Sequence, residues 1–222
     1  MNLARTQPTP ILVFGFEPFL DFDENPTQLL VQRLNARTFE GERVTGVVLP
    51  VEYEGAERSI TRAIDRVKPG LAIGFGLAAG REKVNPEKIA VNYRSAESED
   101  NSGRKMAGSP IDVSGPDGLF TSLPVEGLVA FLNAHGIPAS LSLSAGSYVC
   151  NTAMYVIVRE ARRRGFMGGF VHVPCHSEWI AKKKKQMPSL PLETIQRGAE
   201  HCIAYCLQQR KKGRAHSDNK RE

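Results

Sequence analysis

The sequence contains no apolar run that approaches the roughly 18 residues needed to span a bilayer as a helix. Its first ten residues are polar and lack the apolar core of a secretion signal, so no such signal is predicted. Cysteine is scarce, with 4 in 222 residues, which does not suit a disulfide framework for a chain of this size. These absences predict no membrane association and a reducing, cytoplasmic setting.

Basic stretches with interleaved aromatic residues are also lacking, although the net charge is +5. Much of the positive excess lies in residues 182–185 and 210–222. Surfaces that bind nucleic-acid strands combine basic and aromatic side chains, so no nucleic-acid partner is predicted. The second stretch has no apolar periodicity, and we expect an α/β domain over residues 1–209 followed by a basic, disordered tail over 210–222.

Short apolar segments alternate with amphipathic ones along most of the chain. Strands are predicted at residues 10–14, 44–49, 71–75, 89–93, 138–143 and 169–174, and helices at 26–35, 52–67, 124–135, 153–164 and 191–207. This alternation predicts a single-domain α/β fold, a three-layer αβα sandwich with a mainly parallel sheet. The polar segment 94–116 is long for a loop, which is typical of a segment that covers a site.

Cys150 lies where a predicted strand passes into a predicted helix. Four small residues, 144–147, permit a tight turn between the two elements. The unpaired N–H groups at a helix start favour a thiolate, which is the setting of a nucleophilic cysteine. A buried and inert cysteine would fit the same spacing.

His172 stands between two valines in the short β-type run 169–174. Alternation along a strand would place Phe170 and His172 on the same face. The carboxyl ends of neighbouring parallel strands lie together, so His172 can approach Cys150 there. The alternative is a core histidine whose ring is satisfied by hydrogen bonds.

Two further patterns suggest cofactors but are incomplete. His172, Cys175 and His176 have an H-x-x-C-H spacing, yet no second cluster would complete four metal ligands. The Gly-rich loop 74–81 has Ala79 where a dinucleotide-binding loop needs its third glycine. No metal and no organic cofactor is therefore predicted.

Four separated motifs resemble those of the pyroglutamyl peptidase type I family, also called pyrrolidone-carboxylate peptidase. They are Gly15-Phe16-Glu17-Pro18-Phe19 followed by Asn25-Pro26, the loop 74–81 followed by Pro86-Glu87, Val149-Cys150-Asn151, and the run 169–174. They stand in the family's order and cover roughly residues 10–205, and Asp100-Asn101 in the polar segment is similar as well. The resemblance implies a cysteine omega-peptidase that removes N-terminal pyroglutamate from peptides through an acyl-enzyme.

The resemblance also implies roles for individual residues. Cys150 would be the nucleophile, His172 the proton carrier and Glu87, rather than Glu82, the carboxylate that orients the histidine. From the residues alone, Glu87 would read as a solvated loop carboxylate. The implied substrate-binding residues, two of which clamp the lactam ring, are Phe16, Phe19, Asn25, Leu77, Tyr148 and Val149.

The chain departs from the family's pattern at three positions. Leu20 replaces a usual glycine, Val51 a frequent threonine, and Glu97 an arginine that lies near the scissile carbonyl. Arg94 could fill the place of that arginine if the loop shifts, and we expect the shift because long polar segments move at low cost. The alternative function is a homologue with weak or lost peptidase activity that acts as a binding protein. The family often forms homotetramers, which implies a homo-oligomer.

Overall fold

The computed structural model describes the backbone of residues 9–218 and the side chains of residues 9–213. The strands of the central sheet are β1 (Ile11–Phe16), β2 (Thr38–Phe39), β3 (Glu42–Leu49), β4 (Leu71–Leu77), β5 (Asn85–Pro86) and β10 (Met167–Val173). Smaller pairs are β6 (Ile89–Val91) with β9 (Gly118–Phe120), β7 (Arg94–Ser95) with β8 (Ala107–Ser109), and β11 (Cys175–His176) with β12 (Ser189–Leu190). The helices are α1 (Pro26–Leu34), α2 (Tyr53–Val67), α3 (Val125–Ala134), α4 (Val149–Arg164), α5 (Ser177–Lys183) and α6 (Leu192–Asp218).

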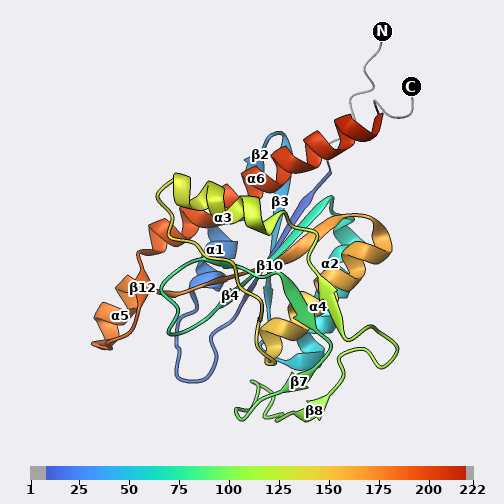
Figure 1. The fold of residues 1–222 in the computed structure, drawn as a ribbon. Coiled ribbons are helices and arrows are strands. Elements are labelled where there is room, and N and C mark those ends of the chain that lie inside the picture. The colour runs from blue at the N-terminus through green and yellow to red at the C-terminus, as the bar shows by residue number, and fades with distance from the viewer. Residues whose placement is uncertain (1–8, 219–222) are drawn as a thin grey trace.

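Within the described range, the central sheet has six strands in the order β2-β3-β1-β4-β10-β5, and helices cover both of its faces (Figure 1). The four inner strands are parallel, and the short β2 and β5 pair antiparallel at the two edges. The predicted fold class, a single-domain αβα sandwich with a mainly parallel sheet, is confirmed.

Alternating side chains of each inner strand feed two separate cores. Ile11, Val13, Ile73 and Val171 face α1, α3 and α6 on one side of the sheet. Leu12, Phe14, Ala72 and Phe170 face α2 and α4 on the other side. Apolar residues on both faces are what an inner parallel strand requires, because helices cover it on each side.

Two glycines of β4 allow the α4 side of the fold to approach the sheet closely. A Cβ on Gly74 would lie 3.0 Å from Cδ1 of Ile157 in α4, and a Cβ on Gly76 would lie 3.0 Å from the sulfur of Cys150. Gly76 is also paired with His172 in the ladder between β4 and β10. The missing side chain at Gly76 therefore makes room for sulfur and histidine to lie over the same point of the sheet.

Residues 138–143 do not form the predicted strand. They make only two isolated bridges, Val84 with Ala139 and Glu87 with Ser142. Their neighbour is the two-residue β5, in which Pro86 has no N–H to donate to a ladder. The segment is held by single hydrogen bonds, such as that from the N–H of Ser142 to the carbonyl of Pro86 at 3.0 Å.

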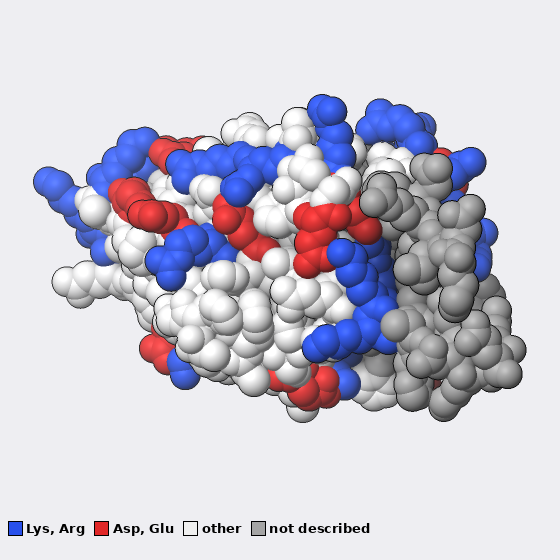
Figure 2. Space-filling view, turned by 90° about the horizontal axis from the view of Figure 1, so that it is seen from above, with Lys and Arg blue, Asp and Glu red and all other residues white. Residues whose placement is uncertain are grey.

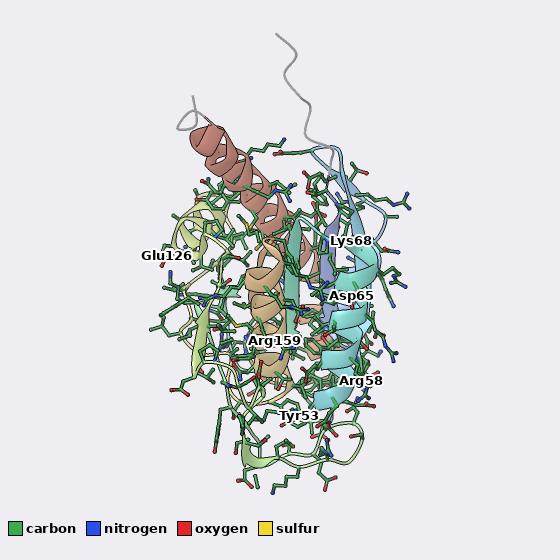
Figure 3. The ribbon with its side chains drawn as sticks, turned by 90° about the vertical axis from the view of Figure 1, so that its right-hand side faces the viewer. Tyr53, Arg58, Asp65, Lys68, Glu126 and Arg159 are labelled. Carbon is green, nitrogen blue, oxygen red and sulfur yellow. The ribbon has the colours of Figure 1, made fainter. Side chains whose placement is uncertain are left out.

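The polar segment 94–116 is tied to the helices of one face. Arg159 of α4 bonds Asp112 in this segment at 3.3 Å and Glu57 of α2 at 3.1 Å. Figure 3 shows α2 and α4 side by side, with Arg159 on α4. The segment is therefore fastened at its far end and contains the β7–β8 pair.

The expectation of a disordered tail from residue 210 is wrong for residues 210–218, because α6 continues to Asp218. Residues 219–222 lie outside the described residues. Arg210 is only 9% exposed, and its Nη2 donates to both carboxylate oxygens of Glu42 at the start of β3. The domain therefore extends past residue 209.

Charges of both signs lie close together on the surface. Seen from above, Lys and Arg side chains alternate with Asp and Glu rather than forming one basic surface (Figure 2). Ion pairs such as Arg164 with Asp65 at 2.6 Å and Lys211 with Glu40 at 2.5 Å join the two signs. Across the described helices, none combines the length and the apolar character needed to span a membrane.

Candidate active site

Cys150 is the second residue of α4. Tyr148 precedes the helix as its N-cap residue and has extended backbone, and Gly146 (φ 77°) provides the turn before it. The first N–H groups of a helix have no intrahelical acceptor, so those of Val149 and Cys150 are available to an anionic oxygen. The predicted position at a helix start thus agrees with the structure.

The thiol of Cys150 is not held as a thiolate. Burial among protein atoms, together with the nearby Glu87 carboxylate, raises its pKa to about 12, and the opposing effects of Arg81 and the backbone are smaller. The expectation that the helix start favours the thiolate is therefore outweighed. The sulfur requires a base to take its proton.

The His172 ring lies on the same face of β10 as Phe170, as the alternation predicts. Its Nδ1 lies 2.7 Å from Oε1 of Glu87, and the two residues are only 4% and 0% exposed. With the carboxylate accepting from Nδ1–H, Nε2 is left to accept a proton. Among the described residues, no hydrogen bond joins the sulfur of Cys150 to this ring, so proton transfer requires the two side chains to approach each other.

Burial and the contact between Glu87 and His172 act in opposite directions on the pKa of each group. Burial alone would raise the pKa of Glu87, but the hydrogen bond and charge of His172, followed by other donors, bring it below the ordinary value. Burial lowers the pKa of His172, and Glu87 only partly opposes this. The resting pair is therefore a carboxylate and a neutral imidazole.

Next to the sulfur of Cys150 is a small apolar pocket. It is lined by Phe16, Phe19, Asn25, Val51, Leu77, Tyr148, Val149 and Cys150, which include all six predicted substrate-binding residues. Its free volume is only about 10 Å³. That is about the minimum that one water molecule needs, so a ring-sized ligand can enter only if the walls move.

Phe19 in the pocket lining belongs to the loop of residues 17–24, which we call the phenylalanine loop. Phe19 packs on Phe22 at 5.6 Å, Phe22 packs on Trp179 of α5 at 4.9 Å, and Trp179 donates to Asp23 at 2.6 Å. At the tip, Leu20 has φ 49°, a left-handed conformation that favours glycine. The loop therefore carries local strain at the position where the family usually has glycine.

Asn25 anchors the phenylalanine loop. Its Nδ2 donates to the carbonyl of Glu17 at 3.0 Å, and its Oδ1 accepts from both the N–H and the hydroxyl of Thr27. Asn25 is fully buried, and its polar atoms are used within the protein. Asn25 therefore contributes to the pocket lining while its polar atoms hold the loop in place.

The structure does not bring Arg94 or Glu97 into this pocket, and a place for either side chain at the scissile carbonyl stays a prediction. Arg94 is held by Glu54 at 3.5 Å and by the carbonyls of Pro110 and Ile111, and its side chain is only 12% exposed. The side chain of Glu97 is fully exposed and pairs with Lys105. Neither the Arg94 guanidinium nor the Glu97 carboxylate lines the apolar pocket.

The sequence assigned no role to Asp100 and Asn101, which bond the segment 94–116 to the start of α2 and to the phenylalanine loop. The carboxylate of Asp100 accepts from the backbone N–H of Tyr53, and Asn101 donates to Oε1 of Glu17 and to the carbonyl of Pro18. The similarity of Asp100-Asn101 to the family's pattern was the available signal, but the sequence alone gives no partner for either side chain.

Arg81 was also missed. Its Nη1 bonds the same Glu87 oxygen that faces His172, at 2.9 Å. The available signal was a cation directly after Gly80 in a loop that follows a buried strand. The sequence also assigned no role to Asn151, next to Cys150, although its side-chain amide bonds the backbone of Val91 on β6.

Within the described residues, no group of three or more His, Cys, Asp or Glu side chains could hold a metal ion. The H-x-x-C-H residues point to other partners. His172 faces Glu87, and Cys175 contacts the sulfur of Met187 at 3.4 Å. His176 lies 3.4 Å from a carboxylate oxygen of Glu178.

A family model and individual relatives match the same region, which is most of the chain. The family model described as pyroglutamyl peptidase matches residues 9–209. The chain is 52% identical over 202 residues to pyrrolidone-carboxylate peptidase 1 of Saccharolobus solfataricus, covering 91% of this chain and 96% of that protein. It is 39% identical over 199 residues to pyrrolidone-carboxylate peptidase of Oceanobacillus iheyensis, covering 89% and 98%.

Solved structures give the same result. The structure of pyrrolidone carboxyl peptidase from Pyrococcus furiosus superimposes with a TM-score of 0.88 at 34% identity, covering 90% of this chain and 99% of that one. A single-residue mutant of the pyrrolidone carboxyl peptidase from the same organism gives a TM-score of 0.87 at 36% identity over the same shares.

Proposed function

The chain belongs to the pyroglutamyl peptidase family, and on that premise we propose that it cleaves N-terminal pyroglutamate from peptides with Cys150, His172 and Glu87 as catalytic residues. The observation that carries the proposal is the buried hydrogen bond between His172 and Glu87 beside a cysteine at a helix start. An oriented neutral imidazole is the base that a protonated thiol requires.

The apolar pocket would hold the pyroglutamyl ring. None of its lining residues carries a carboxylate that could pair with an ammonium group. An ordinary N-terminus would bring an unpaired positive charge into apolar surroundings, which costs several kcal/mol, whereas the neutral lactam does not. The aromatic rings of Phe16 and Phe19 provide flat walls for a flat ring.

Reaction would begin when Nε2 of His172 takes the proton from the Cys150 thiol and the sulfur attacks the carbonyl carbon of the pyroglutamyl residue. The oxyanion would be held by N–H groups at the start of α4. As the C–N bond breaks, the imidazolium returns its proton to the leaving amine. Glu87 would stabilise the imidazolium in between.

The resulting thioester would then be hydrolysed by water. His172 would accept a proton from the water as it attacks, and the thiol would recover that proton when pyroglutamate leaves. Neither step draws on a metal or an organic cofactor.

The direct test is turnover of a pyroglutamyl chromogenic amide by the parent chain and by Cys150→Ser. Cys202→Ser is the matched control, because Cys202 is fully buried in α6. We expect Cys150→Ser to remove activity and Cys202→Ser to keep it. Parent-like turnover by Cys150→Ser would show that this cysteine is not the nucleophile.

The alternative of a homologue with lost activity relied partly on Glu97. Since the carboxylate of Glu97 is fully exposed and outside the pocket lining, it does not oppose negative charge on the substrate. An inactive parent chain that still binds a pyroglutamyl peptide would restore this alternative.

The cytoplasmic setting, the absence of a nucleic-acid partner and the homo-oligomer stay predictions. Light scattering on the purified chain would measure the assembly state directly. A monomer at working concentrations would contradict the predicted homo-oligomer.

A further inference from the structure

Arg81 lies behind the Glu87–His172 pair and contacts two separate parts of the site. Its Nη1 donates to Oε1 of Glu87 at 2.9 Å, and its Nη2 donates to the carbonyl of Ser144 at 3.1 Å. Ser144 belongs to the turn that leads to Cys150. One guanidinium therefore connects the carboxylate to the segment that places the nucleophile.

The contact with Glu87 is made at the oxygen that matters for catalysis. Oε1 accepts from His172 Nδ1 at 2.7 Å and from Arg81 at 2.9 Å. Glu87 is fully buried, and an isolated buried carboxylate tends to become protonated. Because a guanidinium is always charged, Arg81 compensates the carboxylate whether or not the imidazole is protonated.

The backbone before Arg81 sets the direction of its side chain. Gly80 has φ 86°, a conformation that other residues adopt only with strain, and the N–H of Arg81 returns to the carbonyl of Ala78. This turn places Arg81 at the wall of an open groove of about 640 Å³ lined by residues 80–83, Asn85 and 140–144. Its side chain is 33% exposed, so one side of the guanidinium faces solvent and the other faces Glu87.

We propose that Arg81 is a positioning residue of the reaction, which holds the Glu87 carboxylate against His172 and fixes that carboxylate relative to the turn before Cys150. The proposal rests on the proposed function, since it assigns a role within the same catalytic residues. Arg81 itself acts through Glu87 and the turn.

The electrostatic consequence has a definite sign. The charged groups that act on the pKa of His172 are Glu87 and Arg81. The thiol of Cys150 lies near Gly76, the residue that pairs with His172 in the sheet. Burial is the main cause of the lowered pKa of His172; Glu87 raises that pKa, and Arg81 lowers it further. Removal of the guanidinium should therefore raise the pKa of His172. Since His172 must be neutral to accept the thiol proton, the acid limb of kcat/KM should move to higher pH.

The experiment compares Arg81→Met, Arg81→Lys and the control Lys83→Met on one pyroglutamyl amide over a range of pH. Lys83 is an exposed cation in the same groove, so its removal changes the same formal charge without touching Glu87. We expect Arg81→Met to lower kcat by roughly 10- to 100-fold, since small displacements of catalytic groups cost that much, with little change in KM. Its acid limb should move to higher pH, whereas Lys83→Met should retain the rate and the limb.

Arg81→Lys separates charge from geometry. A lysine keeps the positive charge but lacks the fork that reaches two acceptors at once. It should keep the acid limb of the parent and lose part of kcat. Should Arg81→Met fail to fold, as judged by circular dichroism, Arg81→Gln takes its place, because it also removes the charge and should also move the acid limb.

The outcomes distinguish this proposal from the proposed function. If the parent chain does not cleave the amide, the proposed function fails first. If the parent is active and Arg81→Met, or Arg81→Gln where the former is unfolded, has the kcat of the parent, Arg81 is not a positioning residue. A lower rate in Arg81→Met with an unmoved acid limb would likewise overturn it, since a purely structural role predicts that pattern.

Discussion

Two of the buried carboxylates, those of Glu87 and Glu42, lie near opposite ends of the sheet, and their partners differ. Glu87 is 0% exposed, and one of its oxygens accepts from the ionisable ring of His172 and from Arg81. Glu42 is 7% exposed, and both of its oxygens accept from Arg210 of α6. Burial is similar in the two regions, so burial alone does not tell a catalytic carboxylate from a structural one.

What differs is whether the partner can change its charge. A guanidinium keeps its proton at any accessible pH, so Arg210 cannot exchange a proton with Glu42. The imidazole beside Glu87 can gain and lose a proton, and its second nitrogen is free to exchange it. The first arrangement can fasten a helix to a strand, and the second can move a proton.

The sharpest way to test this contrast is Glu87→Gln. A glutamine keeps the shape of the side chain but cannot stabilise imidazolium, and its amide can orient the ring with the wrong nitrogen protonated. We expect kcat to fall by roughly 10³- to 10⁴-fold, as for loss of the carboxylate in a comparable triad. The melting temperature should change by only a few degrees, measured by circular dichroism.

Glu82→Gln is the matched control, because Glu82 is an exposed carboxylate in the loop that carries Arg81. It should keep the parent kcat. A parent-like rate in Glu87→Gln would remove Glu87 from the catalytic residues and would make the two buried carboxylates alike.

At Arg210 we expect a loss of stability without a loss of activity, the opposite of the result expected at Glu87. Arg210→Met leaves the buried Glu42 without its partner, and breaking such a pair typically costs about 3–5 kcal/mol of stability. Truncation after Gln209 should destabilise for the same reason, contrary to what a disordered tail would allow. At temperatures where the variant is folded, kcat should match that of the parent, because the pair does not touch the site.

Chemical denaturation of Arg210→Met, of Lys211→Met and of the double variant Glu42→Gln/Arg210→Met measures this prediction. Lys211 is exposed and pairs with Glu40, so its loss should cost less than about 1 kcal/mol. The double variant should recover much of the stability, because no unpaired charge remains buried. An unchanged midpoint for Arg210→Met would mean that the end of α6 does not depend on this pair.

Local patterns predicted much of the fold and of the site. The alternation in residues 169–174 gave the face of His172, and the small residues before Cys150 gave the helix start. The segment 138–143 has the same apolar character as a strand, yet its neighbour offers a proline and only two residues to pair with. Whether a strand forms depends on the strand that it pairs with, and the local sequence pattern does not identify that partner.

Long-range partners explain the other differences. Arg210 and Glu42 are 168 residues apart, and the sequence gives no sign of their contact. Arg94 bonds Glu54 and two backbone carbonyls, and the spacing of residues along the chain predicts none of these contacts. Ion pairs between distant segments decide where such side chains point, and composition and spacing do not report them.

A smaller effect is expected at the tip of the phenylalanine loop. Leu20 has φ 49° and is 58% exposed, so glycine there would relieve strain without removing buried surface. Strain of this kind costs roughly 1–2 kcal/mol, and the greater freedom of glycine in the unfolded chain offsets about half of it. Leu20→Gly should therefore raise stability by up to about 1 kcal/mol.

Ala36→Gly is the comparison for this measurement, since Ala36 has φ 66° and lies after α1, outside the pocket lining. Both variants should gain stability in denaturant melts. A loss in Leu20→Gly alone would show that the leucine side chain makes a contact that outweighs the strain.

The smallest effect is expected for Glu97→Arg, because this carboxylate, unlike those of Glu87 and Glu42, is not buried. The side chain of Glu97 is fully exposed, and it borders a hollow with Leu20, Asp100 and Lys105 rather than the apolar pocket. Water and salt screen such a charge, so its influence on a distant oxyanion is a few tenths of a kcal/mol at most. Turnover should therefore change by less than about threefold, whereas a donor placed at the carbonyl would change it by about two orders of magnitude. Arg94→Ala is the companion measurement, and it should lower stability by freeing the β7–β8 pair more than it lowers kcat. A hundredfold acceleration by Glu97→Arg would mean that the segment moves over the substrate, and exposure would then no longer separate this carboxylate from Glu87.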